Sequence, residues 1–136
     1  MSTQAPSKPQ VHVVDDEVLL AEFVTRALRR HYQVTMNVDP ERALEQLLAA
    51  ATVDVVVSDV MMSPFTGLHL YEVAVAARPH LAGRFIFMTG GATTEAGKRF
   101  LEALPRERLL LKPFSPGELE EAVRGVMTSS ASAGAH

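Results

Sequence analysis

The fold is decided by residues 53–59, Val-Asp-Val-Val-Val-Ser-Asp. The apolar residues run together without the alternation of a half-exposed strand, so we expect a strand that is buried on both faces, as in a parallel sheet. Val11–Val14 has the same character and runs into Asp15 and Asp16. Two further strand-like runs follow along the chain, Arg84–Met88 before Thr89 and Leu109–Leu111 before Lys112.

Segments with helical spacing separate these runs. The helices are expected over residues 19–28, 40–51, 68–77, 94–104 and 116–126, and a weaker alternating strand at Gln33–Asn37 is expected at a sheet edge. Asp39 with Pro40 predicts one helix start, and Ser115 with Glu118 predicts a capping box. Five alternating β–α units predict an α/β fold, a doubly wound parallel sheet with right-handed crossovers and helices on both faces.

The composition indicates one globular domain. The 136 residues are 47% hydrophobic and 21% charged, with a net charge of -3 and no cysteine. The acidic balance argues against nucleic acid as the main partner, and no apolar run is long enough for a membrane span. A cytoplasmic location is therefore expected. Residues 10–127 are predicted to form the ordered domain, with flexible tails at 1–9 and 128–136.

Polar residues at the ends of the strands predict the functional site. The carboxyl ends of parallel strands line one crevice, where ligands bind. Asp15, Asp16 and Asp59 are therefore expected to lie together, although close like charges cost on the order of 4 kcal/mol per pair at an effective dielectric of 20. A divalent cation would offset this repulsion, and hard oxygen ligands favour Mg²⁺. The alternative is that Asp15 only caps the first helix.

The crevice also has the groups needed for phosphoryl transfer. Asp59 is the candidate nucleophile, because a carboxylate can attack a phosphoryl group and form an acyl phosphate. The Lys112 ammonium can stabilise the transferring oxygens, and the Thr89 hydroxyl can donate to one of them. The backbone N–H groups of Val60 and Gly90 are further candidate donors. His12 is expected to make a local hydrogen bond within the first strand.

This pattern resembles the receiver domain of two-component response regulators over nearly the whole ordered chain. The residues that carry the resemblance are Val13-Val14-Asp15-Asp16-Glu17, Asp59-Val60-Met61-Met62, Gly67, Met88-Thr89-Gly90 and Lys112-Pro113-Phe114. Residues 85–92 look most like receivers attached to hybrid sensor histidine kinases. The resemblance implies a flavodoxin-like sheet in the order 2-1-3-4-5.

The resemblance also implies a mechanism. Asp59 would accept a phosphoryl group from a phosphohistidine on a sensor histidine kinase or a histidine phosphotransfer protein. Asp16, Asp59 and the Met61 backbone carbonyl would bind Mg²⁺ directly, and Asp15 would act through a water. Thr89 and Lys112 would bind the phosphoryl group. Phosphorylation would then switch a face formed by the fourth helix, fifth strand and fifth helix, which contacts a downstream protein.

Two departures from the family pattern leave an alternative open. Ser63 replaces the usual proline four positions after the phosphorylated aspartate, and Leu109 replaces the switch aromatic three positions before the lysine. The alternative is a receiver-like interaction module that acts without phosphorylation. The only chemistry expected is self-phosphorylation and self-dephosphorylation at Asp59, so the chain is not expected to be a turnover enzyme.

Two other functions of α/β proteins fit the sequence less well. A flavin mononucleotide carrier needs a hydroxyl-rich phosphate loop after the first strand, where Asp15, Asp16 and Glu17 would repel the phosphate. A phosphohydrolase with an aspartyl nucleophile typically has two aspartates separated by one residue, whereas Asp15 and Asp16 are adjacent.

Overall fold

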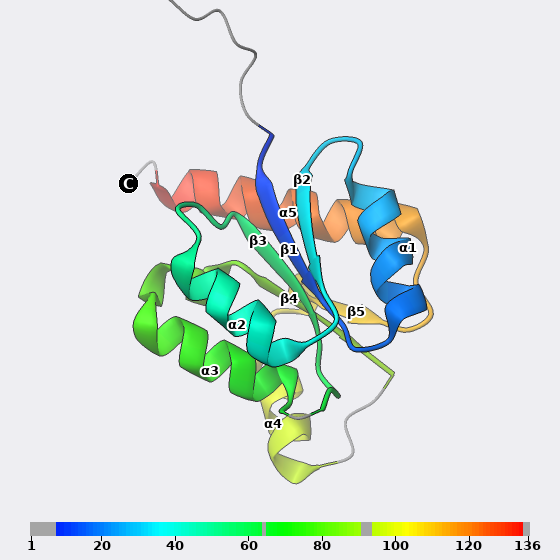
Figure 1. Cartoon of the computed structure of the whole chain (residues 1–136), viewed down its shortest axis with the longest axis vertical. Coiled ribbons are helices and arrows are strands. Elements are labelled where there is room, and N and C mark those ends of the chain that lie inside the picture. Colours follow the sequence, from blue (N-terminus) through cyan, green and yellow to red (C-terminus); the bar gives the residue numbers. More distant parts are fainter. Residues whose placement is uncertain (1–7, 64, 91–93, 135–136) are drawn as a thin grey trace, which may run out of the picture.

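A computed structural model describes residues 8–63, 65–90 and 94–134 of the chain. Its sheet has five parallel strands in the order β2-β1-β3-β4-β5, which confirms the predicted topology (Figure 1). The strands are β1 (Gln10–Val14), β2 (Gln33–Asn37), β3 (Val55–Asp59), β4 (Phe85–Thr89) and β5 (Leu109–Leu111). The helices are α1 (Val18–Leu28), α2 (Pro40–Ala49), α3 (Gly67–Ala77), α4 (Glu95–Ala103) and α5 (Pro116–Gly134), with 3-10 turns at Pro79–Gly83 and Arg106–Arg108.

Helices cover both faces of the sheet, which explains why the central strands do not alternate. Figure 1 shows α1 and α5 on one face and α2 and α3 on the other. Val55 and Val57 pack under α1 and α5, whereas Val56 packs toward α2 and α3. All three have no exposed surface. Each such burial is worth about 1.5–3 kcal/mol, so β3 alone contributes substantially to stability.

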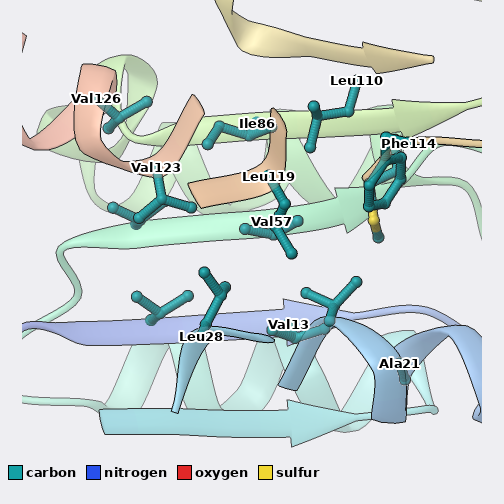
Figure 2. Packing of buried hydrophobic residues seen from close by; sticks show 14 residues of the cluster. Val13, Ala21, Leu28, Val57, Ile86, Leu110, Phe114, Leu119, Val123 and Val126 are labelled. Atoms are coloured by element: carbon teal, nitrogen blue, oxygen red, sulfur yellow. The ribbon is translucent and has the colours of Figure 1, made fainter. Parts of the chain in front are cut away.

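The layer under α1 and α5 is mainly aliphatic. Figure 2 shows Val57 and Ile86 of the sheet facing Leu119 and Val123 of α5, with Leu28 of α1 beside them. The opposite layer contains an aromatic cluster, in which the rings of Phe85 and Phe87 lie 5.5 Å apart and both contact the ring of Tyr71. The Phe100 ring joins this cluster 5.0 Å from Phe87 and holds α4.

The predicted helix starts are confirmed. Asp39 accepts a hydrogen bond from Glu41 N–H at 3.0 Å at the start of α2. Ser115 and Glu118 form the reciprocal capping box, at 2.9 and 3.1 Å. No helix in the described part of the chain is both long and apolar enough to cross a membrane.

Some boundaries differ from those expected. β3 begins at Val55 rather than Val53, and it includes Asp59, because parallel pairing continues to Asp59 opposite Met88. β4 likewise includes Thr89, opposite Leu111. Residues 128–134, where the sequence predicted a flexible tail, continue α5 as a helix. Alanine and serine can extend a helix that tertiary packing has already formed. The remainder of the two predicted tails, apart from Lys8 and Pro9, lies outside the described residues.

The local hydrogen bond expected for His12 is not found among the described residues. The His12 side chain is 4% exposed, and its Nδ1 has no hydrogen-bond partner among the described residues. Its side chain lines a groove with the neutral residues Thr35 and Gln46. Burial lowers the pKa of His12 below its ordinary value of 6.5, so the ring is neutral in the folded protein.

This burial predicts an acid-sensitive contribution to stability. Below pH 6.5 the unfolded chain takes up a proton at His12 more readily than the folded chain, so stability is full above this pH and falls as the pH decreases. His12→Val should therefore lose less stability than wild type between pH 7 and pH 5, measured by urea unfolding. His80→Gln, at an exposed histidine, is the control and should behave as wild type. Equal losses in His12→Val and wild type would contradict the prediction.

Candidate functional site

The strand ends bring the three predicted aspartates together at the carboxyl edge of the sheet. Val14 pairs with Ser58, so Asp15 and Asp59 follow at neighbouring positions of β1 and β3. One carboxylate oxygen from each of Asp15, Asp16 and Asp59 lies within 4.8 Å of the others. Asp59 is 5% exposed and Asp15 has no exposed surface, whereas Asp16 is exposed. The site is thus an acidic cluster with one side open to solvent.

Lys112 supplies the positive charge in this cluster. Its Nζ lies 3.2 Å from Asp59 Oδ1 and 4.0 Å from Asp15 Oδ2. The side chain is 24% exposed, so the ammonium is both paired and accessible. Its backbone N–H donates to the Thr89 carbonyl at 2.9 Å, which fixes the start of the loop after β5. The peptide bond between Lys112 and Pro113 is cis.

The two oxygens of Asp15 have different surroundings. Oδ1 accepts a hydrogen bond from Glu17 N–H at 2.9 Å, just before α1. Oδ2 is buried and accepts no hydrogen bond within the described residues, although Lys112 Nζ is 4.0 Å away. Capping of α1 therefore accounts for the position of Oδ1 but not for the burial of Oδ2. Oδ2 has the Lys112 ammonium at ion-pair distance and no hydrogen-bond donor among the described residues.

Burial raises the pKa of Asp15 to about 7, and the negative charge of Asp59 adds to the rise. The hydrogen bond from Glu17 N–H and the charge of Lys112 oppose it. The Asp15 carboxyl therefore takes up a proton near neutral pH when no metal is bound, chiefly because its buried negative charge is poorly solvated.

Asp16 ties the acidic cluster to the loop after β3. Its Oδ2 accepts a hydrogen bond from Ser63 N–H at 3.1 Å. Met61 lies within the loop held by this bond, and its side chain is 40% exposed. Ser63 thus has an N–H that the proline usual at this position would lack. Pro64 lies outside the described residues.

The cluster fits a magnesium ion. The donors are hard carboxylate oxygens, and the buried Asp15 Oδ2 accepts no hydrogen bond from the described residues. Mg²⁺ typically keeps several waters and takes one or two carboxylates, which suits a cluster that is open at Asp16. No sulfur or imidazole ligand is among the grouped residues, so softer metals are less well matched.

Thr89 and Gly90 lie beside this cluster. The backbone N–H of Val60, which was expected to be a donor to a ligand, is bonded elsewhere. Thr89 is 2% exposed at the end of β4, one strand away from Asp59. A Cβ added at Gly90 would meet nothing within 4 Å among the described residues, so the backbone there is open to a ligand. The Val60 N–H, however, donates to the Met88 carbonyl at 3.1 Å. Val60 N–H is therefore engaged in this structure and is not a free donor.

Sequence reasoning missed two residues that shape the site, Ser58 and Ser63. Ser58 is fully buried and donates to the Asp59 carbonyl oxygen at 2.9 Å. The sequence feature that could have identified Ser58 is a hydroxyl residue directly after the three valines of β3. Ser63 was noted only as a departure from the usual proline.

Comparison with known proteins gives a consistent result. The model of the response regulator receiver domain family matches residues 11–124. The Two-component response regulator ORR3 of Oryza sativa subsp. indica is 28% identical over 130 residues, which cover 93% of this chain and 98% of ORR3. The chain therefore belongs to the response regulator receiver domain family of two-component signalling.

Solved structures agree with this assignment. The chemotaxis response regulator CheY4 of Vibrio cholerae is 27% identical with a TM-score of 0.73, covering 88% of this chain and 99% of CheY4. The receiver domain of the hybrid histidine kinase CckA is 28% identical with a TM-score of 0.66, covering 87% and 98%. A receiver domain protein of Methanospirillum hungatei is 20% identical with a TM-score of 0.78, covering 93% and 98%, and supports the fold.

Proposed function

We propose that Asp59 accepts a phosphoryl group from a phosphohistidine on a sensor histidine kinase or a histidine phosphotransfer protein, in a Mg²⁺-dependent step. The observation that carries this proposal is the arrangement around Asp59. Its carboxylate lies 3.2 Å from Lys112 Nζ and within 4.8 Å of oxygens from Asp15 and Asp16. A nucleophile, a cation and a metal-binding cluster are thus within reach of one phosphoryl group.

In the transfer step, one carboxylate oxygen of Asp59 attacks phosphorus. The O–P bond forms as the P–N bond to the donor imidazole breaks, and the imidazole, protonated by solvent on its other ring nitrogen, leaves as a neutral group. Lys112 moves its ion pair from the carboxylate to a phosphoryl oxygen, and the Thr89 hydroxyl donates to another. The product is an acyl phosphate on Asp59.

The metal would be held by Asp16, Asp59 and the Met61 backbone carbonyl, with Asp15 acting through a water. When bound, Mg²⁺ would offset the charge of the carboxylates and of the transferring oxygens. Chemistry at Asp59 is limited to self-phosphorylation and self-dephosphorylation, so the chain is not a turnover enzyme. The cytoplasmic location expected from the sequence is part of this proposal.

The donor protein is proposed to dock at the start of α1. Val18 is 50% exposed and Leu19 is 80% exposed, two and three residues after Asp16. Phe23 is 36% exposed on the next turn and packs against the ring of Phe114 at 6.2 Å. An apolar surface beside a charged acceptor site suits a protein donor, because such a surface is unfavourable in water.

This docking surface gives a specific prediction. Leu19→Ser should slow phosphotransfer from a phosphorylated histidine phosphotransfer domain by about tenfold at limiting donor concentration, since an interface anchor is worth about 1–2 kcal/mol. The rate with acetyl phosphate should not change. Leu48→Ser, at a leucine of α2 that is 42% exposed, is the matched control. Equal slowing with both donors would mean that Leu19 acts on the site itself.

The downstream partner is proposed to bind the face formed by α4, β5 and α5. Leu111 on β5 is 62% exposed, and a groove of about 400 Å³ between β5 and α5 includes Leu109 and Ala122. The half-buried Phe100 and Leu101 of α4 pack on the aromatic cluster side of the sheet, and Gly97 is the one buried residue within the described helix. A weakly attached helix beside exposed apolar residues can change position when the site is phosphorylated.

The second candidate function is a receiver-like module that binds partners without phosphorylation. Leu109 favours it, because the position usual for the switch aromatic holds a half-buried aliphatic residue against the aromatic cluster. Binding of a downstream protein that is equally tight with and without phosphorylation would support this function. The complete acceptor site favours the first proposal.

Intact mass spectrometry tests the proposed function. The protein is incubated with acetyl phosphate, with Mg²⁺ and with excess chelator. A gain of one phosphoryl group that requires Mg²⁺ is the expected result. If no phosphoryl group is gained while Mg²⁺ still binds, the same assay with a phosphorylated histidine phosphotransfer domain decides between strict use of a protein donor and the interaction module.

A further inference from the structure

Ser58 places a buried hydroxyl directly before the proposed phosphoryl acceptor. It pairs with Val14 of β1 and with Phe87 of β4, and both belong to the apolar layer under α2 and α3. Neighbours in a parallel sheet share a face, so Ser58 points into that layer. A buried hydroxyl there is costly unless it is hydrogen bonded, and its Oγ donates to the Asp59 carbonyl oxygen at 2.9 Å.

Gly67, the first residue of α3, lies directly against the same carbonyl group. A Cβ added at Gly67 would collide with the Asp59 carbonyl oxygen and would lie 3.1 Å from Ser58 Oγ. The Gly67 N–H also donates to the Val60 carbonyl at 2.8 Å. Because glycine has no side chain, the start of α3 can lie directly against the end of β3.

These contacts fix the peptide that links Asp59 to Val60. Ser58 binds the carbonyl oxygen of this peptide, and its N–H, from Val60, donates to the Met88 carbonyl at 3.1 Å. Both ends of the peptide dipole are therefore held. Rotation of this peptide would turn the backbone that carries the Asp59 carboxylate and the loop that begins with Met61.

We propose that Ser58 is a positioning residue for the acidic site, and that its hydroxyl, together with Gly67, holds the Asp59–Val60 peptide in the orientation that metal binding requires. The inference rests on the proposed function, since it concerns how the same site binds Mg²⁺. Ser58 touches neither the metal nor the phosphoryl group in this proposal. It acts through the backbone of Asp59.

Titration calorimetry with Mg²⁺ alone tests the inference without any phosphorylation. Ser58→Ala removes one hydrogen bond, so Mg²⁺ affinity should fall about five- to tenfold. Ser58→Thr keeps the hydroxyl and should restore affinity close to wild type. If its added methyl group prevents folding, Ser58→Cys, with a weaker donor, replaces it and should lie between alanine and wild type. With acetyl phosphate, the Mg²⁺ concentration for half-maximal phosphorylation should rise by the same factor.

Val55→Ala separates positioning from loss of stability. Val55 is fully buried at the opposite end of β3, so its truncation destabilises the protein without touching the Asp59 carbonyl. Its Mg²⁺ affinity should match wild type. If wild type binds Mg²⁺ and Ser58→Ala binds it equally well, the inference is overturned and the proposed function stands. If wild type neither binds Mg²⁺ nor gains a phosphoryl group from acetyl phosphate, both the inference and the proposed function are overturned.

Discussion

Asp59→Asn is expected to reduce phosphoryl acceptance below detection. An amide is a far weaker nucleophile than a carboxylate, so the acyl phosphate cannot form at this position. The substitution is nearly isosteric, and the side chain remains within reach of Lys112, so folding should be retained. Intact mass after incubation with acetyl phosphate and Mg²⁺ measures the result.

Asp54→Asn is the matched control for this experiment. Asp54 precedes the same strand, and its Oδ2 accepts a hydrogen bond from Gln10 N–H at 2.7 Å, at the opposite edge of the sheet. The chemical change is identical, but the acidic cluster is untouched. Asp54→Asn should therefore be phosphorylated as wild type is. Phosphorylation of Asp59→Asn to the wild-type level would show that another residue is the acceptor.

Asp15→Asn is expected to stabilise the metal-free protein at pH 8. The folded-state pKa of Asp15 is raised from 3.8 to about 7, so the folded protein holds a proton that the unfolded chain releases. Stability from this group is therefore present below about pH 4 and is lost as the pH rises toward 7. About three pKa units correspond to about 4 kcal/mol. Asp15→Asn should avoid roughly half of this loss of stability, because the cluster is open to solvent at Asp16 and the charge is partly screened.

Magnesium should reverse the order of stability. The ion stabilises wild type by about 2.7 kcal/mol at one hundred times its dissociation constant. Asp15→Asn lacks one negative charge of the cluster, so it should gain much less from the same concentration. Urea unfolding at pH 8, with chelator and with Mg²⁺, measures both effects. If wild type and Asp15→Asn were equally stable without metal, the prediction that the buried Asp15 charge destabilises the folded protein would be contradicted.

The family resemblance and the strand pattern predicted most of the fold. Runs such as Val55–Val57 could only be buried on both faces, and this required helices on each side of a parallel sheet. Capping residues also gave the starts of α2 and α5, because a cap is a local interaction. The extent of α5 was not predictable in the same way. Its terminal segment has a tail-like composition, yet it continues a helix that packing against the sheet supports.

The sequence by itself determined which groups meet at the acidic site, because strand order and strand ends place Asp15, Asp59 and Lys112 at one edge. Only the tertiary structure decided how far these groups are buried and which hydrogen bonds they make. It buries one oxygen of Asp15 without a hydrogen bond from any described residue, engages the N–H of Val60, and sets Ser58 and Gly67 against the Asp59 carbonyl. Burial and hydrogen bonding depend on what neighbouring elements bring within a few ångströms, and spacing along the chain does not encode these distances.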